Sequence, residues 1–168
     1  KPAKIIRSSE YIKEVDIQNA ISMIREAKRP YILVGGGAVI SDAADELKEF
    51  AEKVDAPVCD TLMGKGAFNG TDERYSGMLG MHGTKASNLG VSHCDLLIAV
   101  GTRFSDRVLG NPKTFAKNAK ILQIDVDPVE INKNICVSAS IIGDVKAVLT
   151  VINRRLEAQE HKEWLDTV

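Results

Sequence analysis

The stretch "DLLIAVG", residues 95–101, decides the fold. It is apolar at every position from residue 96 to residue 100 and ends in a glycine. A strand with one face in water alternates apolar and polar residues, so an unbroken apolar run is typical of a strand buried on both faces. Such strands belong to parallel sheets that carry helices on both sides. The stretch therefore predicts the centre of an α/β domain.

Further strands are predicted on both sides of this one. Their sequences are "YILVGGG" (31–37), "APVCDT" (56–61), "KILQIDVD" (120–127) and "ASIIGD" (139–144), with a sixth short strand near 75–79. Helical stretches separate most of them, and this alternation indicates parallel pairing. The predicted fold class is α/β: a three-layer, Rossmann-like domain with a mostly parallel sheet of about six strands and helices on both faces.

Helices are predicted where apolar residues recur three and four positions apart. The first begins at Asp16, a residue suited to the N-cap, and the second begins near Ser41. The last opens directly after Asp144, which is also suited to the N-cap.

The domain boundaries are predicted from where this periodicity starts and stops. Residues 1–15 are predicted to be a linker from a preceding domain, residues 16–156 the domain, and residues 157–168 a linker toward the next domain. Trp164 and Leu165 lie in that last stretch, which has little other apolar content. We expect both to meet the neighbouring domain.

Composition excludes several classes of function. The 168 residues have a net charge of −1, which gives no long-range attraction to nucleic acid, and no apolar run is long enough to span a membrane. The three cysteines lie far apart without a CxxC pair, so we expect reduced thiols, a cytoplasmic location and no metal site. Because the first residue is Lys1, we also expect the chain to be either part of a longer protein or a processed one.

Small or acidic residues close the predicted strands: Gly35, Thr61, Gly101, Asp127 and Gly143. In open parallel sheets, ligands bind outside the carboxyl ends of the strands. These residues therefore point to one cleft.

The glycine run "GGGAVI" (35–40) has two interpretations. Glycines after a strand let the backbone approach a pyrophosphate, as in a dinucleotide-binding loop. Ile40 breaks the GxGxxG pattern, however, and a tight strand-to-helix turn that needs positive φ explains the glycines equally well. Both interpretations stay open.

The stretch "GTRFSDRV" (101–108) places Arg103 and Arg107 beside Gly101. Two guanidinium groups at the carboxyl end of a strand suit a diphosphate, because each donates paired hydrogen bonds. The alternative is a solvated loop in which Asp106 pairs locally. The position of the charges favours the anion site.

The acidic stretch "IDVDPVE" (124–130) resembles a metal site, but Asp127 and Glu130 around a proline also form the start of a helix. We favour the helix start, which leaves Asp125 to accept hydrogen bonds from ribose hydroxyls. In "HCD" (93–95), Cys94 is predicted to begin the buried strand rather than to act as a nucleophile, because catalytic groups are assembled from distant segments.

Two glycine-bracketed loops carry methionines, "TLMGKGAFNG" (61–70) and "LGMHGTKASN" (79–88). Methionine is flexible and polarisable, so these loops are predicted to form adaptable apolar walls around a ring system.

Six of these segments together resemble a known family. "YILVGGG", "TLMGKGAF", "GMLGMHGT", "VGTRFSDRV", "IDVDP" and "GDVKAVL" occur in the order and at the spacing of the central domain of the acetolactate synthase (acetohydroxyacid synthase) large catalytic subunit. The resemblance covers about residues 15–155 and identifies the chain as similar to the thiamine-diphosphate enzymes.

The resemblance implies a central FAD-binding domain, with FAD in an extended pose and Met81 and His82 along the flavin. The family's FAD contacts correspond here to Gly35, Gly36, Gly37, Thr61, Leu62, Met63, Leu79, Gly80, Met81, His82, Gly101, Thr102, Arg103, Arg107, Val108, Asp125, Val126, Gly143 and Asp144. No residue of this chain is expected to be catalytic or to bind a metal.

The resemblance also implies what other domains supply. Thiamine diphosphate and Mg²⁺ would be bound by the flanking N- and C-terminal domains of the full-length enzyme, so this domain alone is expected to be inactive. The full enzyme would be a flavoprotein transferase in branched-chain amino acid biosynthesis, a homo-oligomer with a regulatory small subunit.

The chain departs from the family at two places. Ser105 replaces the first of two usual acids in "RFSDR", and the N-terminal arm does not align with that of relatives, so that Arg7 is a candidate for the arginine that relatives place near the cofactor. One rival function is a purely architectural middle domain of another thiamine-diphosphate enzyme, with no FAD bound. A second rival, an NAD-dependent dehydrogenase, requires the GxGxxG pattern that Ile40 breaks.

Overall fold

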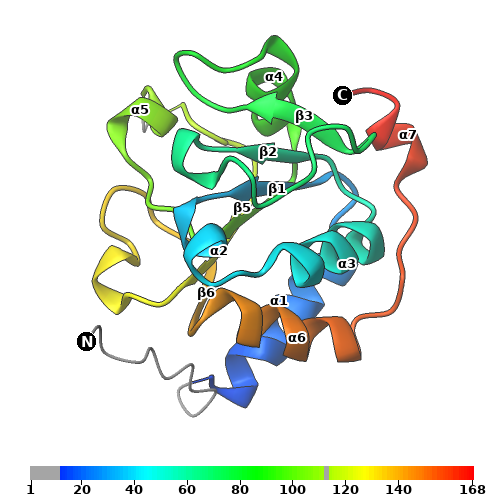
Figure 1. Ribbon diagram of the computed structural model, residues 1–168, viewed down its shortest axis with the longest axis vertical. Helices are drawn as coiled ribbons and strands as arrows, with labels where there is room; N and C mark the ends of the chain where they lie inside the picture. Colours follow the sequence, from blue (N-terminus) through cyan, green and yellow to red (C-terminus); the bar gives the residue numbers. More distant parts are fainter. Residues whose placement is uncertain (1–11, 112–113) are drawn as a thin grey trace.

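One parallel sheet organises the protein (Figure 1). The computed structural model describes residues 12–111 and 114–168, so the candidate Arg7 lies outside the described residues. The sheet order is β3-β2-β1-β4-β5-β6 and every pair is parallel, which is the order of a doubly wound Rossmann-type sheet. The strands are β1 (Pro30–Val34), β2 (Val58–Asp60), β3 (Tyr75–Met78), β4 (Leu96–Val100), β5 (Lys120–Asp125) and β6 (Ala139–Ile142). The predicted α/β class is confirmed.

Helices cover both faces of this sheet. On one face lie α1 (Glu14–Glu26), α3 (Ala44–Val54) and α6 (Val145–Arg155); on the other lie α4 (Lys85–His93) and the short α5 (Asp106–Leu109) and α7 (Lys162–Leu165). Short turns follow three strands: α2 (Gly36–Ile40), η1 (Leu62–Gly64) and η2 (Pro128–Glu130). Among the helices described, none has the length and apolarity needed to cross a bilayer.

The central strand β4 is buried on both faces, as predicted. Leu96, Ile98 and Val100 pack into the core beneath α1, α3 and α6. Leu97 and Ala99 pack into the second core, on the side of α4. All five are at most 1% exposed, which explains why the sequence tolerates no polar residue here.

The chain leaves the two central strands in opposite directions. After β1 it continues into α3 on the first face, and after β4 it continues into α5 on the second. In doubly wound sheets this divergence marks the place where ligands bind. The β1–β4 boundary is therefore the first place to look for a site.

Two predicted helix starts need correction. Helix α1 begins at Glu14 after Lys13, so Asp16 lies in the first turn, where its carboxylate faces the positive end of the helix dipole. Residues 36–40 form the separate helix α2 rather than a loop, and the next helix begins at Ala44. The N-cap role of Asp144 is confirmed, because its carboxylate accepts from the Ala147 amide at 3.2 Å.

The C-terminal segment is fastened to the domain. The Trp164 indole N–H donates to the Pro30 carbonyl at 2.8 Å, and its ring meets Tyr31 edge-on at 6.4 Å. The His161 amide donates to the Asp55 carboxylate at 2.7 Å. With only 7% of its surface exposed, Trp164 packs within this domain, whereas the sequence predicted that it meets a neighbouring domain. The domain boundaries themselves stay predictions.

Candidate functional site

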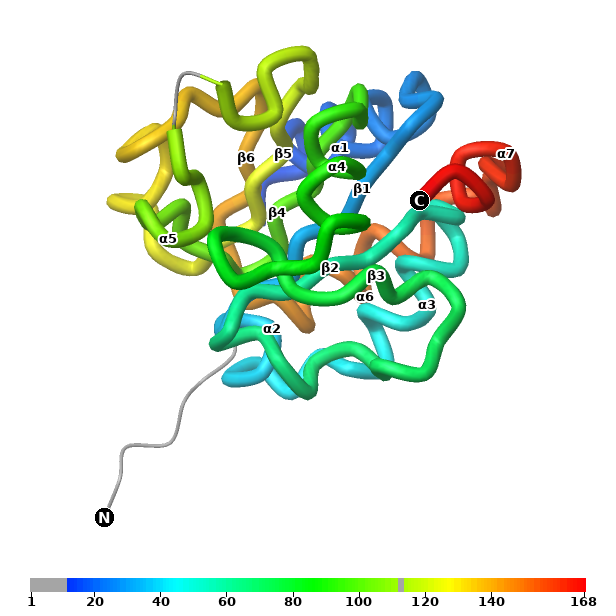
Figure 2. Tube along the Cα trace, turned by 90° about the horizontal axis from the view of Figure 1, so that it is seen from above, coloured from blue at the N-terminus to red at the C-terminus, as the bar shows by residue number. Residues whose placement is uncertain are grey.

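The predicted site residues follow the carboxyl ends of the six strands, and the parallel sheet brings those ends to one edge. Hydrogen bonds join the segments directly. The Gly37 amide donates to Gly101 O at 2.8 Å, and the Met81 amide donates to Arg107 O at 3.4 Å. Figure 2 shows α2, α5 and the turn after β3 on one side of the molecule and α7 on the other. The predicted residues thus share one continuous edge.

Not all of them offer a side chain to a ligand. The exposed ones are Leu62, Met63, Met81, His82, Arg103, Arg107 and Val126. Partly buried are Gly36, Gly37, Gly80, Gly101, Val108 and Asp144, and buried are Gly35, Thr61, Leu79, Thr102, Asp125 and Gly143. Leu79 packs in the core, and the Thr61 hydroxyl accepts from the Gly64 amide at 3.2 Å, so these two side chains build the edge rather than face outward.

The glycine run is needed for close packing and not for positive φ. Gly35 has a φ of −114°, and a methyl group added to it would lie 2.4 Å from Gly101 O. Positive φ occurs instead at Gly101, at 59°. The amides of Gly35 and Gly37 already donate to Val100 O and Gly101 O. The glycines therefore do form a tight strand-to-helix turn. They are needed there because the ends of β1 and β4 are in close contact, and not because the turn requires positive φ.

The arginines carry unpaired positive charge at this edge. Arg103 lies in the loop after β4 and Arg107 in α5, and both are exposed. Within residues 12–111 and 114–168, neither guanidinium makes an ion pair or hydrogen bond, so the alternative in which Asp106 pairs locally is wrong. Unpaired guanidinium groups are suited to bind phosphate oxygens.

Large apolar side chains are exposed along the same edge. Leu62 and Met63 in η1 and Met81 after β3, which we call the apolar ledge, are 69%, 75% and 77% exposed. Val39 and Ile40 in α2 and Val126 and Val129 around η2 are also exposed. These exposed side chains all follow the carboxyl ends of strands, which makes this edge the candidate for a binding surface.

The acidic residues have distinct positions. Asp127 caps η2 by accepting from the Val129 amide at 2.9 Å, which confirms the predicted helix start. Asp125 is 7% exposed and accepts from the Asp127 amide at 3.0 Å. Burial raises the pKa of Asp125 above its usual value, and nearby Glu130 and Asp127 add to that shift. Within the described part of the chain, no group of three His, Cys, Asp or Glu side chains is placed to hold a metal ion.

The "HCD" stretch does not form a nucleophilic site. Cys94 lies at the end of α4 rather than in the strand, is 1% exposed, and donates its thiol to Val91 O. Burial raises the pKa of Cys94 to about 12. The neighbouring His93 ring lies 2.8 Å from Leu89 O of its own helix.

These environments predict the reactivity of the three thiols. Cys59 and Cys94 are buried, and burial raises the pKa of both, whereas Cys136 is exposed. Because the thiolate is the reactive form, a disulfide reagent at pH 8 should titrate one thiol in the folded protein and three in denaturant. The absorbance of the released reagent measures both counts. Two fast thiols in the folded protein would contradict the buried positions.

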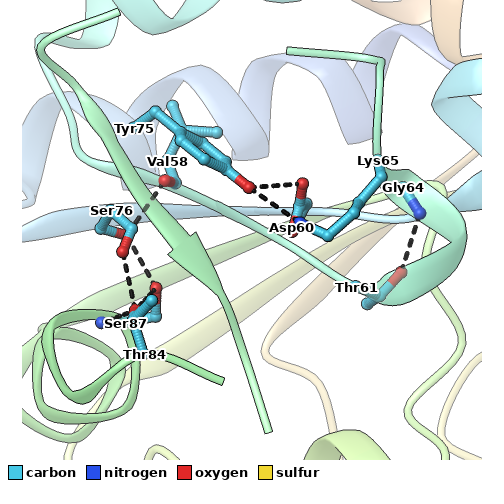
Figure 3. A network of polar contacts seen from close by, with 9 residues as sticks. All are labelled: Val58, Asp60, Thr61, Gly64, Lys65, Tyr75, Ser76, Thr84 and Ser87. Carbon is cyan, nitrogen blue, oxygen red and sulfur yellow. Dashed lines mark hydrogen bonds and ion pairs between the residues drawn. The ribbon is translucent and has the colours of Figure 1, made fainter. Parts of the chain in front are cut away.

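One polar cluster at this edge was missed by the sequence analysis. Asp60, Lys65 and Tyr75 come from β2, the residue after η1 and β3, and their side chains meet (Figure 3). The only local signal was an acid closing the apolar strand "APVCDT". The partners of that acid lie 5 and 15 residues away, and neither the methionine loop that contains Lys65 nor the short strand that begins at Tyr75 indicates this pairing.

Two surface hollows lie away from the edge. One of about 490 Å³ is lined by Ala27, Lys28 and residues 160–164, near the amino end of β1. The other, of about 340 Å³, lies between α1 and α6. Neither includes a predicted site residue, so the binding assignment rests on the strand ends and their chemistry.

The doubly wound sheet defines a Rossmann-like domain whose candidate site lies at the carboxyl edge. Residues 17–152 match the family model described as thiamine pyrophosphate enzyme, central domain, and the chain belongs to this family.

Similar proteins have one description in common. The chain is 50% identical to a probable acetolactate synthase large subunit of Methanocaldococcus jannaschii, over 92% of this chain and 27% of that protein. It is 51% identical to the acetolactate synthase large subunit of Cyanidium caldarium, over 90% of this chain and 27% of that protein. It is 44% identical to the acetolactate synthase large subunit of Corynebacterium glutamicum, over 89% of this chain and 25% of that protein. The chain thus spans about a quarter of the length of these relatives.

Proposed function

We propose that this chain is the FAD-binding central domain of an acetolactate synthase large subunit. The full-length enzyme would condense two pyruvates, or pyruvate with 2-oxobutyrate, in branched-chain amino acid biosynthesis. The family and the names of the relatives support the enzyme. One observation supports FAD binding: Arg103 and Arg107, which have no ion-pair partner among the described residues, lie on the same edge of the sheet as the apolar ledge.

The chemistry of this edge fits an extended dinucleotide. Arg103 and Arg107 offer charge-assisted hydrogen bonds to a diphosphate. The apolar ledge offers a surface for a flat ring, and Met63 and Met81 adapt to its shape because methionine is flexible. Farther along the same edge, at the carboxyl end of β5, the Asp125 carboxylate can accept from a ribose hydroxyl. The role of this chain is to bind and orient the cofactor.

Other parts of the full-length enzyme would supply the reaction centre. Thiamine diphosphate provides the carbanion chemistry in this family of enzymes, and we assign it, with Mg²⁺, to the flanking domains. The domain alone would form no acetolactate from pyruvate. The full-length enzyme would be cytoplasmic and homo-oligomeric, with a regulatory small subunit as partner.

An architectural domain without FAD is the second candidate. The fit of the Gly35–Gly37 turn against β4 favours it, because amides of that turn are already used within the protein. In that case the edge would only pack against neighbouring domains, and the arginines would have no ligand.

Arginine substitution separates these two functions. FAD titrated into the purified chain should lose fluorescence on binding, and Arg103→Ala should weaken the affinity by about 1–3 kcal/mol, because a hydrogen bond to charged phosphate is lost. Arg154→Ala is the matched control, since Arg154 is an exposed arginine at the far end of α6. Equal affinities for all three proteins would remove the diphosphate role, and no quenching at high FAD would favour the architectural domain.

A further inference from the structure

A closed ring of hydrogen bonds ties the end of β2 to the segment that follows it (Figure 3). The Lys65 ammonium donates to Asp60 Oδ1 at 3.3 Å and to the Tyr75 hydroxyl at 3.2 Å. The Tyr75 hydroxyl donates to Asp60 Oδ2 at 2.8 Å. Both oxygens of the carboxylate are therefore satisfied by the other two residues of the ring.

The two charges of this ring have different environments. The Asp60 side chain is 4% exposed, whereas the Lys65 side chain is 50% exposed. Because the ammonium stays half-exposed, water weakens its attraction to Asp60, and the pair contributes little net stability.

The Lys65 ammonium has an unused donor. The hydrogen bond to Tyr75 and the charge of Asp60 raise the pKa of Lys65, so the amine is protonated. A protonated lysine has three N–H groups. Asp60 and Tyr75 accept from two of them, and within the described residues no other group accepts from the third.

This donor belongs to the segment that carries two residues of the apolar ledge. Lys65 directly follows η1, which carries Leu62 and Met63. The turn is fixed at both ends: the Thr61 hydroxyl accepts from the Gly64 amide, and a methyl group on Gly64 would lie 2.3 Å from Val34 O. The ring of hydrogen bonds then anchors the ammonium itself. The backbone that carries Leu62 and Met63 and the Lys65 ammonium are thus both fastened to the carboxyl end of the sheet.

We propose that the third N–H of Lys65 donates a hydrogen bond to a carbonyl oxygen of the flat ring that lies on the apolar ledge. Lys65 is thereby a binding residue that selects a ring with an acceptor edge, such as the dione half of a flavin, over a purely apolar ring. Asp60 and Tyr75 are positioning residues that hold the ammonium. This inference rests on the proposed FAD function.

The test compares two ligands that share the diphosphate but differ in the ring. Lys65→Met keeps the length of the side chain and removes its donors. Isothermal titration should show FAD affinity lowered about tenfold or more, because one charge-assisted hydrogen bond is lost. The affinity for ADP, which has no flavin, should stay within about twofold of wild type, since the lost bond is to the ring.

Two control variants distinguish a direct contact between Lys65 and the ligand from a general loosening of the segment. Tyr75→Phe weakens the ring of hydrogen bonds but keeps the ammonium, and it should lower FAD affinity less than Lys65→Met does. Lys48→Met removes an exposed lysine of α3 that, among the described residues, pairs only with Glu52, and it should change neither affinity.

Each adverse outcome has its own meaning. FAD affinity unchanged in Lys65→Met, with wild type binding FAD, would overturn the role of Lys65 and leave the proposed function standing. Equal losses for FAD and ADP would show that Lys65 only supports the fold of the edge, which also overturns the inference. A wild-type chain that binds no FAD would overturn both.

Discussion

Replacing Trp164 by alanine is expected to lower the free energy of unfolding by about 3–5 kcal/mol. The indole is 7% exposed, packs edge-on to the buried Tyr31 ring, and donates to the Pro30 carbonyl. Alanine removes the packing and leaves that carbonyl without its donor. The loss is large for a residue four positions from the end of the chain, because Trp164 is part of the second hydrophobic core.

Equilibrium denaturation in urea, followed by circular dichroism, measures this loss. Tryptophan fluorescence is unsuitable because Trp164 is the single tryptophan of the chain. Trp164→Phe is the control: it keeps most of the apolar area and loses the hydrogen bond, so it should cost about 1–2 kcal/mol. If Trp164→Ala had the midpoint of wild type, residues 157–168 would be a loose linker after all.

Gly35→Ala is expected to cost about 3 kcal/mol of stability and to abolish detectable FAD binding. The added methyl group would lie 2.4 Å from Gly101 O and 2.4 Å from Thr102 Cβ. Both belong to the segment that leaves β4, and Gly101 O is backbone, so the strand ends must move apart to accept it. Because Arg103 and Arg107 follow on that segment, this movement displaces the charges of the candidate site.

Gly70→Ala is the matched control for this substitution. A methyl group on Gly70 would meet only the Tyr75 ring, at the ordinary distance of 3.7 Å, so stability should change by less than about 0.5 kcal/mol. Urea midpoints and FAD titrations of the two variants provide the comparison. If Gly35→Ala were as stable as Gly70→Ala, the close contact between the ends of β1 and β4 would be contradicted.

The position of α2 shows where local prediction reached its limit. Residues 36–40 begin with two glycines, which are poor helix formers, and a loop was the reasonable expectation. In the folded chain the Gly37 amide donates to Gly101 O, a contact with a distant segment that no window of sequence around residue 36 contains. The close approach of the same segment also explains why residue 35 is a glycine, where the sequence suggested a need for positive φ.

Local patterns were sufficient for the α/β class, the buried strand β4, the caps at Asp127 and Asp144, and the edge on which the candidate site lies, because periodicity and capping depend on neighbours a few residues apart. The fastening of Trp164, the pairing of Asp60 with Lys65 and Tyr75, and the freedom of Arg103 and Arg107 from Asp106 came only with the folded chain. Each of them depends on which side chains meet across strands or loops. Such contacts are determined by distance in the folded structure, and residues far apart in the sequence make them.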